Sequence, residues 1–310
     1  MSNPNFDALL STTLANYRDQ LTDNVFSDRV LTNHLMGKGR IRMLSGGTKI
    51  VEPLIHGTND TVASYAGYDT LSLKPQAGIT AAEYEWRQYA ASISISGIEE
   101  AKNNGEQEII NLLEAKIMQA EESLREGFNT MFYADGTGNG NKDWNGLGNL
   151  IEANTDVGGI AVSGNDYWKS YEENSATALT LAQMATAYNT VSMGNDHPDL
   201  VLTTQTLFEK YEGLLQPSVR YTDTKTANSG FQNLLFKNAP VVYDAACTPG
   251  VMYFMNSKYI SLVGHKSKWF SQTAFVRPED LDARYALIMC YGNLTIRNRK
   301  RQGKLTAKTA

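Results

Sequence analysis

Three glycines at alternate positions form the part of this sequence that comes nearest to a phosphate-binding loop. Gly136, Gly138 and Gly140 lie in the string DGTGNG. A dinucleotide-binding fingerprint needs a strand before its glycines and a helix after them, and a P-loop needs Lys followed by Ser or Thr. Here a helical pattern precedes the glycines and Asn-Lys-Asp-Trp follows them. We therefore interpret the segment as a turn beyond the end of a helix.

Histidine and cysteine, the side chains most often used for metal binding and nucleophilic catalysis, show no useful spacing. The histidines are His34, His56, His197 and His265. None stands three or four residues from another, and no cysteine accompanies any of them, so neither a metal site nor a cofactor is predicted. Cys247 and Cys290 belong to no CxxC or catalytic signature. We predict that both are reduced and behave as small apolar residues.

Two pairs of adjacent acids remain as candidates for general acid–base chemistry. They are Glu99 with Glu100 and Glu121 with Glu122. Adjacent side chains on a helix or a strand point in different directions, so neither pair converges on a substrate. A solvated face or an intersubunit salt bridge explains them better. The sequence thus predicts no catalytic residue, and an enzyme with an α/β domain and a lid is the less favoured class.

Composition places the chain among ordinary globular proteins. It has 310 residues, 42% of them hydrophobic and 20% charged, with a formal net charge of −5. Neither a signal peptide nor a membrane span is predicted, because no long apolar run occurs. Residues 297–310 contain no acid and carry a basic cluster: Arg297, Arg299, Lys300, Arg301, Lys304 and Lys308. This tail suits contact with nucleic acid or an acidic neighbour, with a solvated terminal extension as the alternative.

The elements that would position these residues begin with a helical arm over residues 1–36. Asn3 suits a helix cap and Pro4 the first helical position. A narrow apolar stripe follows, which must lie on the body or on another subunit. Its predicted contact residues are Phe6, Leu9, Leu14 and Tyr17.

A long two-stranded arm is predicted next. Strand patterns over residues 48–54 and 79–95 flank a polar, glycine-containing stretch. A hairpin without a third strand is marginal in water, so it should pack on a neighbouring molecule. Tyr65, Tyr68 and Leu71 are its predicted contact residues. Within 79–95 the alternation slips once between Trp86 and Tyr89, as at a β-bulge.

One long amphipathic helix and a compact α/β unit complete the predicted elements. The helix spans 104–133, with apolar residues at helical spacing such as Leu113, Ile117 and Leu124. Beyond residue 175 we expect helices over 179–193 and 204–215, followed by short strands and a last strong strand. The short strands are predicted at 199–202, 233–236, 240–243, 251–256 and 259–263, and the last strand at 287–296. The fold class is α+β.

This order of elements resembles the major capsid proteins of tailed bacteriophages, with the Hong Kong 97 phage-type fold. The resemblance covers nearly the whole chain, and several strings are similar to that family: YEWRQYAA at 84–91, ISISG at 93–97, DGTG at 135–138, GLGNLI at 146–151, PEDLDA at 278–283 and YGNL at 291–294. The order of the strings carries the resemblance more than any single one.

The resemblance implies a domain map. It gives an N-terminal arm at 1–36, an extended E-loop hairpin at 37–82, a peripheral domain at 83–176 and 284–310 with its spine helix at 104–133, and an axial domain at 177–283. Loops around 218–230 would then surround the capsomer axis. The basic tail, from Arg297 to Lys304, would face packaged DNA.

The resemblance also implies partners. Copies of the chain would form pentamers and hexamers in an icosahedral shell around non-specifically held double-stranded DNA, assembled in the bacterial host cytoplasm and located in the virion, with no membrane and no cofactor involved. Many family members carry a scaffolding segment before the arm, which here begins at Met1. A separate scaffolding protein, beside a portal, is therefore expected unless none is needed. The nearest alternative is an encapsulin-type compartment shell that stores a cargo enzyme.

Overall fold

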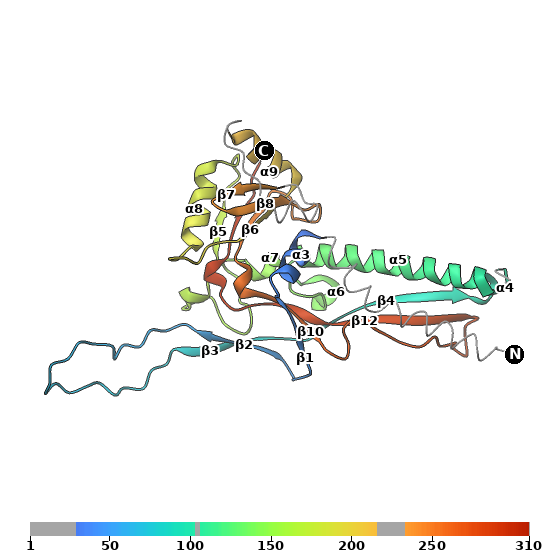
Figure 1. Ribbon diagram of the computed structural model, residues 1–310, viewed down its shortest axis with the longest axis horizontal. Helices are drawn as coiled ribbons and strands as arrows, with labels where there is room; N and C mark the ends of the chain where they lie inside the picture. The colour runs from blue at the N-terminus through green and yellow to red at the C-terminus, as the bar shows by residue number, and fades with distance from the viewer. Residues whose placement is uncertain (1–28, 103–105, 216–232, 310) are drawn as a thin grey trace.

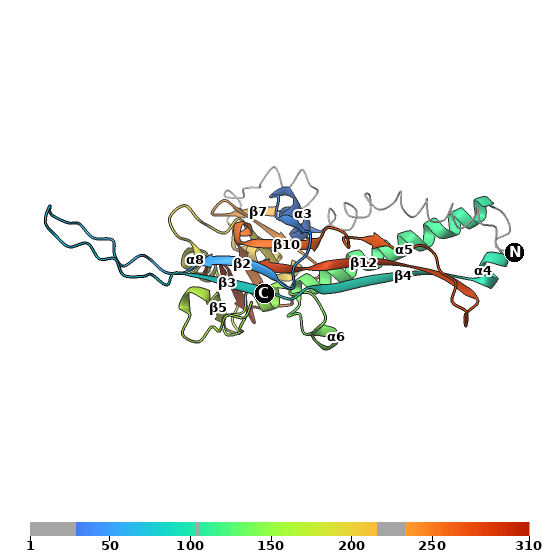
Figure 2. The same cartoon turned by 90° about the horizontal axis from the view of Figure 1, so that it is seen from below.

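The computed structural model describes residues 29–102, 106–215 and 233–309, which form two larger sheets and one two-stranded hairpin. The hairpin and the loop beyond it extend from one end of the molecule. A long helix lies along a two-stranded ribbon, formed by residues 87–96 and 283–292, toward the other end (Figure 1). A compact α/β unit stands to one side between these two extensions. Seen from below, the arm and the ribbon run in opposite directions from the body (Figure 2).

The long helix, α5 (Glu106–Tyr133), has 28 residues and is therefore about 42 Å long at 1.5 Å per residue. It ends at the predicted residue, and its predicted start at 104 falls outside the described residues. Leu113, Ile117, Leu124 and Phe128 are buried, so the predicted apolar stripe faces the body. Phe128 packs edge-on against Tyr89 of the ribbon, with ring centroids 4.8 Å apart.

A five-stranded sheet supports this helix. Its strands are β1 (Ile41–Leu44), β10 (Ile260–His265), β12 (Ala283–Ile296), β11 (Ser271–Gln272) and β4 (Arg87–Ser96). β12 has 14 residues and pairs antiparallel with β10 near its end and with β4 over its first part. The last strand predicted at 287–296 is thus confirmed and begins earlier than expected.

The predicted single strand over 79–95 is wrong in one respect, because it is two strands in different sheets. β3 (Ile79–Tyr84) pairs with β2 (Ile50–Ile55) in the hairpin, whereas β4 pairs with β12. Glu85 and Trp86 lie between β3 and β4, where the chain passes from the hairpin to the five-stranded sheet, and they form hydrogen bonds to residues outside these two strands. Asn293 Nδ2 donates to the Glu85 carbonyl oxygen at 2.9 Å, and Trp86 Nε1 donates to the Gly47 carbonyl oxygen at 2.9 Å. The slip in alternation marks this transfer between sheets.

A six-stranded sheet with two covering helices forms the compact unit. Its order is β5 (Tyr171–Asn174), β13 (Gly303–Thr306), β9 (Met252–Met255), β6 (Leu200–Thr203), β8 (Ala239–Tyr243) and β7 (Asn233–Phe236), with α8 (Leu181–Val191) and α9 (Gln205–Leu214) beside it. The helices and short strands predicted here are confirmed, except that the strand predicted at 259–263 is β10 of the other sheet. Thr180 caps α8 in a capping box with Gln183.

Strand pairing corrects the predicted domain borders at 177 and 284. β5 and β13, assigned to the peripheral domain, pair within the six-stranded sheet, and β10 and β11, assigned to the axial domain, pair with β12. Because backbone hydrogen bonds between strands define the layers, each predicted border separates strands that belong together. The chain crosses between the two units at several points.

Shorter helices connect these elements. They are α3 (Val30–Gly37), α4 (Gly97–Lys102), α6 (Gly138–Asn141), α7 (Leu147–Leu150) and the 3-10 turns η1 (Asp166–Trp168), η2 (Ser257–Tyr259) and η3 (Arg299–Arg301). The predicted glycine turn beyond the long helix is confirmed: Gly136 and Gly140 have φ of 76° and 67°, in the left-handed region that favours glycine. Of the predicted arm over 1–36, only α3 lies within the described residues.

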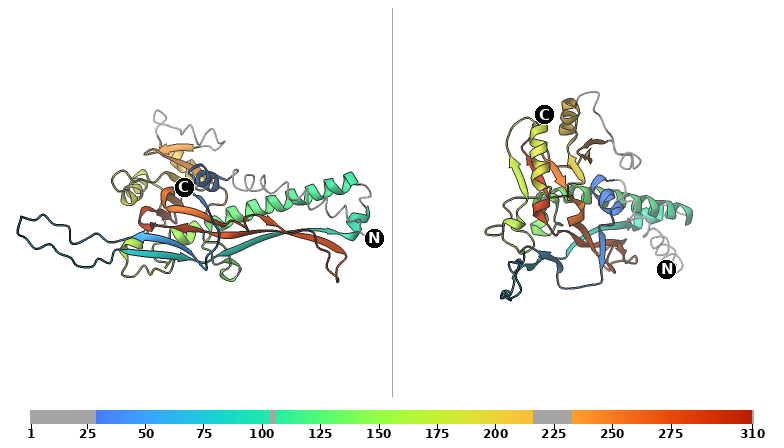
Figure 3. Two further views of the ribbon diagram at one scale, coloured as in Figure 1. Left: turned by 60° about the horizontal axis from the view of Figure 1, so that its bottom comes forward. Right: turned by 60° about the vertical axis from the view of Figure 1, so that its left-hand side comes forward.

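The larger of two apolar clusters lies under the long helix and continues over one face of the six-stranded sheet through β6, β8 and β9, and the smaller fills the other face against α8 and α9. Buried polar groups add further contacts between the two units. Asp244, which follows β8, accepts hydrogen bonds from Asn129 Nδ2 at 3.0 Å and from the Tyr133 hydroxyl at 3.1 Å. These contacts fix the last turns of α5 to the six-stranded sheet. The arm, the ribbon and the compact unit are therefore connected parts of one folded body (Figure 3).

Candidate interaction surfaces

The loop of residues 56–78 extends away from the body (Figure 1), and its large apolar side chains belong to neither core. Tyr65, Tyr68 and Leu71 are 67%, 105% and 57% exposed. Exposed apolar surface of this kind marks an interaction site, and a two-stranded hairpin is marginal without further packing. The structure thus gives the predicted contact residues the exposure that an intersubunit role requires, and that role stays a prediction.

The root of this arm is held firmly, in contrast to its tip. On β3, Ala82 and Tyr84 face the body and are buried, while Ile55 and Ile79 at the far end of the hairpin are exposed. The backbone N–H of Glu83 donates to the Gly158 carbonyl oxygen at 2.8 Å. The arm is therefore fixed to the body at its root, whereas its far end packs on neither core.

The other predicted contact stripe, Phe6, Leu9, Leu14 and Tyr17, lies outside the described residues. The helix that follows it, α3, is attached to the compact unit. His34 Nε2 lies 3.3 Å from Asp199 Oδ2, and Lys38 Nζ lies 3.7 Å from the same oxygen. Burial alone would raise the pKa of Asp199, but the bonds and charge of His34, with bonds from Ser257, outweigh it and lower that pKa to about 2.

The predicted DNA-facing tail is wrong at Arg299, which is fully buried. Its Nε donates to the Leu150 carbonyl oxygen at 3.0 Å and its Nη1 to that of Thr155 at 2.8 Å, while Nη2 donates to that of Glu152. Burial lowers the pKa of Arg299 to about 10, so the guanidinium stays charged near neutral pH. Its three bonds hold the loop after α7 in place.

Arg301 and Lys304 are also buried, so the prediction of a DNA-facing role is wrong for them too. Arg301 Nη1 donates to the Val191 carbonyl oxygen at 3.4 Å, and Lys304 forms ion pairs with Glu152 and Glu172. In the cluster predicted to face DNA, Lys300 is exposed, and Arg297 is partly exposed. Charge composition indicated a tail where the chain forms a strand of the six-stranded sheet.

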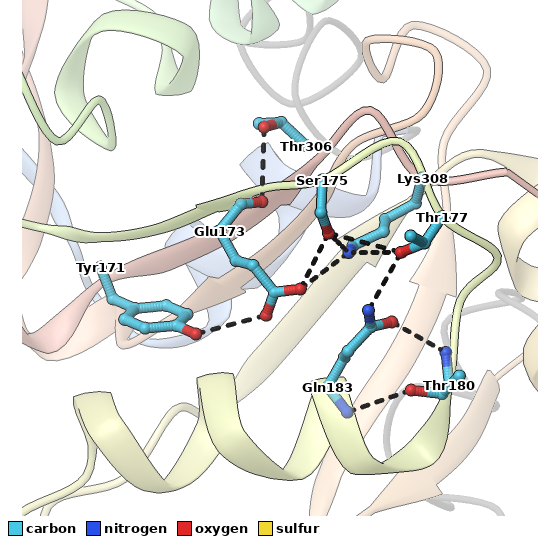
Figure 4. A network of polar contacts seen from close by, with 8 residues as sticks. All are labelled: Tyr171, Glu173, Ser175, Thr177, Thr180, Gln183, Thr306 and Lys308. Atoms are coloured by element: carbon cyan, nitrogen blue, oxygen red, sulfur yellow. Dashed lines mark hydrogen bonds and ion pairs between the residues drawn. The ribbon is translucent and has the colours of Figure 1, made fainter.

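The end of the chain is not a solvated extension either. Lys308, whose side chain is fully buried, donates to Glu173 Oε1 at 2.9 Å, to the Ser175 hydroxyl and to Thr177 Oγ1 at 3.4 Å (Figure 4). Gln183 Nε2 bonds the same Thr177 hydroxyl at 3.1 Å and so links this network to the start of α8. The hydrogen bond from Lys308 lowers the pKa of Glu173. The last residues thus fasten β5, β13 and α8 together.

Apart from Glu121 and Glu122, which both pair with Arg125 of the same helix, the residues considered for chemistry do not gather at one site. Among the residues that the structure describes, no group of three or more His, Cys, Asp or Glu side chains could hold a metal ion, and no helix is long and apolar enough to cross a membrane. Cys247 and Cys290 are buried and unpaired, as predicted, and burial raises the pKa of both thiols. Glu99 and Glu100 pair with different partners, Lys116 and Arg284, and therefore do not converge.

Comparison with solved structures identifies the fold. No family model and no curated protein sequence matches the chain. The cyanophage A-1(L) capsid asymmetric unit aligns with a TM-score of 0.64 and 16% identity over 87% of this chain and 91% of that one. The capsid of a native GTA particle aligns at 0.58 and 10% identity, over 88% and 89%. An encapsulin complex from Synechococcus elongatus aligns at 0.55 and 10% identity, over 88% and 87%.

These matches span nearly the full length of both chains in each pair. The chain therefore has the fold of phage capsid and encapsulin shell proteins, and the predicted α+β Hong Kong 97 phage-type fold is confirmed. At such low identity the likeness establishes the fold alone.

Proposed function

We propose that this chain is the major capsid protein of a tailed double-stranded DNA bacteriophage and assembles into its icosahedral shell. The observation that carries the proposal is the match to a phage capsid subunit over 87% of this chain and 91% of the other. The exposed apolar arm supports it, because apolar side chains gathered on an exposed segment mark a site where another molecule binds. Many weak contacts of this kind, repeated by symmetry, close a shell.

The roles of the parts follow from this proposal. The hairpin arm, as an E-loop, lies on a neighbouring subunit through Tyr65, Tyr68 and Leu71, and the stripe from Phe6 to Tyr17 makes further contacts. Pentamers and hexamers form around the compact axial unit. Packaged DNA is held without base reading, with Lys300 as a candidate exposed contact. A separate scaffolding protein and a portal complete the assembly, which takes place in the host cytoplasm.

An encapsulin-type compartment shell is the second candidate, because an encapsulin subunit shares the fold over 88% of this chain. The two functions differ in content: a phage capsid encloses DNA, and a compartment encloses a cargo protein bound at its inner surface. An enzyme with a lid arm is less favoured: a cavity beside β5 gathers ionisable side chains, but its Glu152 and Glu172 are both engaged in ion pairs with the buried Lys304.

Expression of the full chain tests the proposal. The product is examined by sedimentation and negative-stain microscopy, alone and with an extract of phage-infected cells. Shells, tubes or ring-shaped capsomers are expected, and particles from infected cells should protect double-stranded DNA from nuclease. A folded monomer that never assembles under either condition would overturn the proposal, and closed shells that retain a host cargo protein and no DNA would favour the compartment.

A further inference from the structure

A carboxylate is buried in the root of the hairpin arm, on the face of β2 that packs against the body. Ile50, Glu52 and Leu54 alternate along this face and are 0%, 1% and 6% exposed. Alternation of this kind normally places apolar side chains inward. Burial of an ionised carboxylate is unfavourable unless neighbouring groups compensate for its lost hydration. Glu52 therefore depends on specific partners.

Two arginines and a threonine supply these partners. Arg42 Nη1 on β1 donates to Glu52 Oε1 at 2.6 Å, and Arg297 Nε, just beyond β12, lies 3.0 Å from Glu52 Oε2. Thr295 Oγ1 on β12 lies 3.2 Å from Oε1. β1 and β12 flank β10 in the five-stranded sheet. The carboxylate of the arm is thus held from two strands of the body at once.

The cluster is asymmetric in charge and in burial. The arginine side chains of residues 42 and 297 are 35% and 38% exposed, whereas Glu52 is almost completely buried. Each arginine keeps access to water, so its charge can be hydrated when part of the cluster is lost. Loss of the carboxylate leaves two guanidinium groups facing each other without a counter-charge. Glu52 is the member on which the cluster depends.

Other contacts hold the arm root independently of this cluster. Tyr84 of β3 donates to the Ile296 carbonyl oxygen at 2.8 Å. The imidazole of His56 stacks on the Tyr167 ring, with centroids 4.4 Å apart. Both contacts would persist without the Glu52 carboxylate, so its removal leaves the hairpin attached by fewer constraints.

We propose that Glu52 is the positioning residue of the arm: clamped between Arg42 and Arg297, its carboxylate sets the direction in which residues 56–78 leave the body. The arm is long relative to its root, so a small rotation at β2 moves the tip by a large distance (Figure 3). That direction determines where the tip meets a second copy of the chain. The contact between the tip and a second copy rests on the proposed function. The direction of the arm relative to the body is a property of a single chain and can be measured without assembly.

Distance measurement between two spin labels tests the inference on the unassembled full chain. Ser64→Cys places a label on the arm and Ala182→Cys places one on α8, both at exposed positions, while the buried Cys247 and Cys290 stay unlabelled under native conditions. The parent chain should give one narrow distance distribution. Glu52→Gln should broaden it and shift its centre.

Two matched variants separate positioning from general stability. Glu173→Gln removes the carboxylate partner of buried Lys308, remote from the arm, and Glu83→Gln, on the hairpin itself, removes one of the two exposed carboxylates that pair with Lys49. Both should keep the narrow distribution, even where Glu173→Gln lowers the melting temperature. If Glu52→Gln does not fold, Arg42→Gln takes its place and should broaden the distribution to a lesser degree.

An unchanged distribution in a folded Glu52→Gln or Arg42→Gln chain would overturn the inference, as would equal broadening in Glu173→Gln. The result is independent of whether shells form. Broadening in a chain that never assembles would refute the proposed function and leave the positioning role intact. Assembly by the parent chain with no broadening in Glu52→Gln would support the proposed function and refute the positioning role of Glu52.

Discussion

The hydroxyl of Tyr84 donates a hydrogen bond to the backbone carbonyl oxygen of Ile296 at 2.8 Å, between residues 212 positions apart. Tyr84 ends β3 at the root of the arm, and Ile296 ends β12, which forms the ribbon beneath the long helix. One strand therefore touches both extensions of the molecule. The arm and the ribbon are therefore connected through β12 as well as through Glu85 and Trp86, which join them in sequence.

Tyr84→Phe should lower the free energy of unfolding by about 1 kcal/mol, the usual net value of a buried hydrogen bond. Burial raises the pKa of the Tyr84 hydroxyl, so the bond is present throughout the neutral range and the loss should not vary there. Urea denaturation followed by tryptophan fluorescence measures it. Tyr65→Phe, at an exposed position on the arm, is the control and should leave stability unchanged.

Deletion of residues 58–74 should abolish assembly while the body stays folded, because these residues lie outside both apolar clusters. Circular dichroism should show native helix content, and sedimentation should show no shells. Tyr68→Ser is the milder variant: its ring is fully exposed, so the monomer should keep its stability and assembly should need a higher protein concentration. Normal shells from the deleted chain would remove the arm from the proposed function.

Local periodicity explains which parts of this fold were predictable. The positions of Leu113, Ile117 and Leu124 define a helix face without reference to the rest of the chain. The two-stranded arm followed from local alternation in the same way. The separation of β3 from β4 did not, because a slip near Trp86 looks the same for a bulge and for a change of sheet. Strand partners distant in sequence decide between them.

In the basic tail, by contrast, the charge composition led to a wrong prediction, because Arg299, Arg301 and Lys304 are buried. Arg299 binds the carbonyl oxygens of residues 150, 152 and 155, and backbone carbonyls have no signature in a sequence. The carboxylate partners of Lys304 lie more than 130 positions earlier in the chain. The short alternating string at residues 303–306 was the one local sign of a strand. Among the candidate surfaces, the sequence indicated the arm and missed the anchor at Glu52.

Asp199 should make stability depend on pH in the acid range. Its pKa falls from 3.8 to about 2 on folding, so its ion pair stabilises the protein fully above pH 3.8. That contribution, up to about 2 kcal/mol, is lost as the pH falls through 2. Asp199→Asn should therefore show a smaller loss of stability than the parent between pH 5 and 2. Parallel stability curves for the two chains would contradict this sign and its source.

Arg299 and Lys300, adjacent in sequence, should respond in opposite ways to loss of charge. Arg299→Met leaves three backbone carbonyls without their donor and should cost about 3 kcal/mol, as for other broken buried networks. Lys300→Gln alters an exposed side chain and should leave the unfolding free energy unchanged. Chemical denaturation of both variants measures the contrast. Equal stabilities would show that the bonds of Arg299 are not needed.

Two glycine-to-alanine substitutions should change stability in opposite directions. At Gly292 on β12, a Cβ atom would lie 2.3 Å from the Val263 carbonyl oxygen and 2.7 Å from the Trp144 ring, both fixed in the larger core. Gly292→Ala should therefore cost about 3 kcal/mol or prevent folding, as overpacking of a tight site does. Gly213 lies in α9 with no atom within 4 Å of such a Cβ. Gly213→Ala should stabilise the protein by about 0.5 kcal/mol, because alanine loses less backbone entropy in a helix. Thermal and urea unfolding of both variants decide the matter, and a tolerated Gly292→Ala would mean that Trp144 can move away from β12.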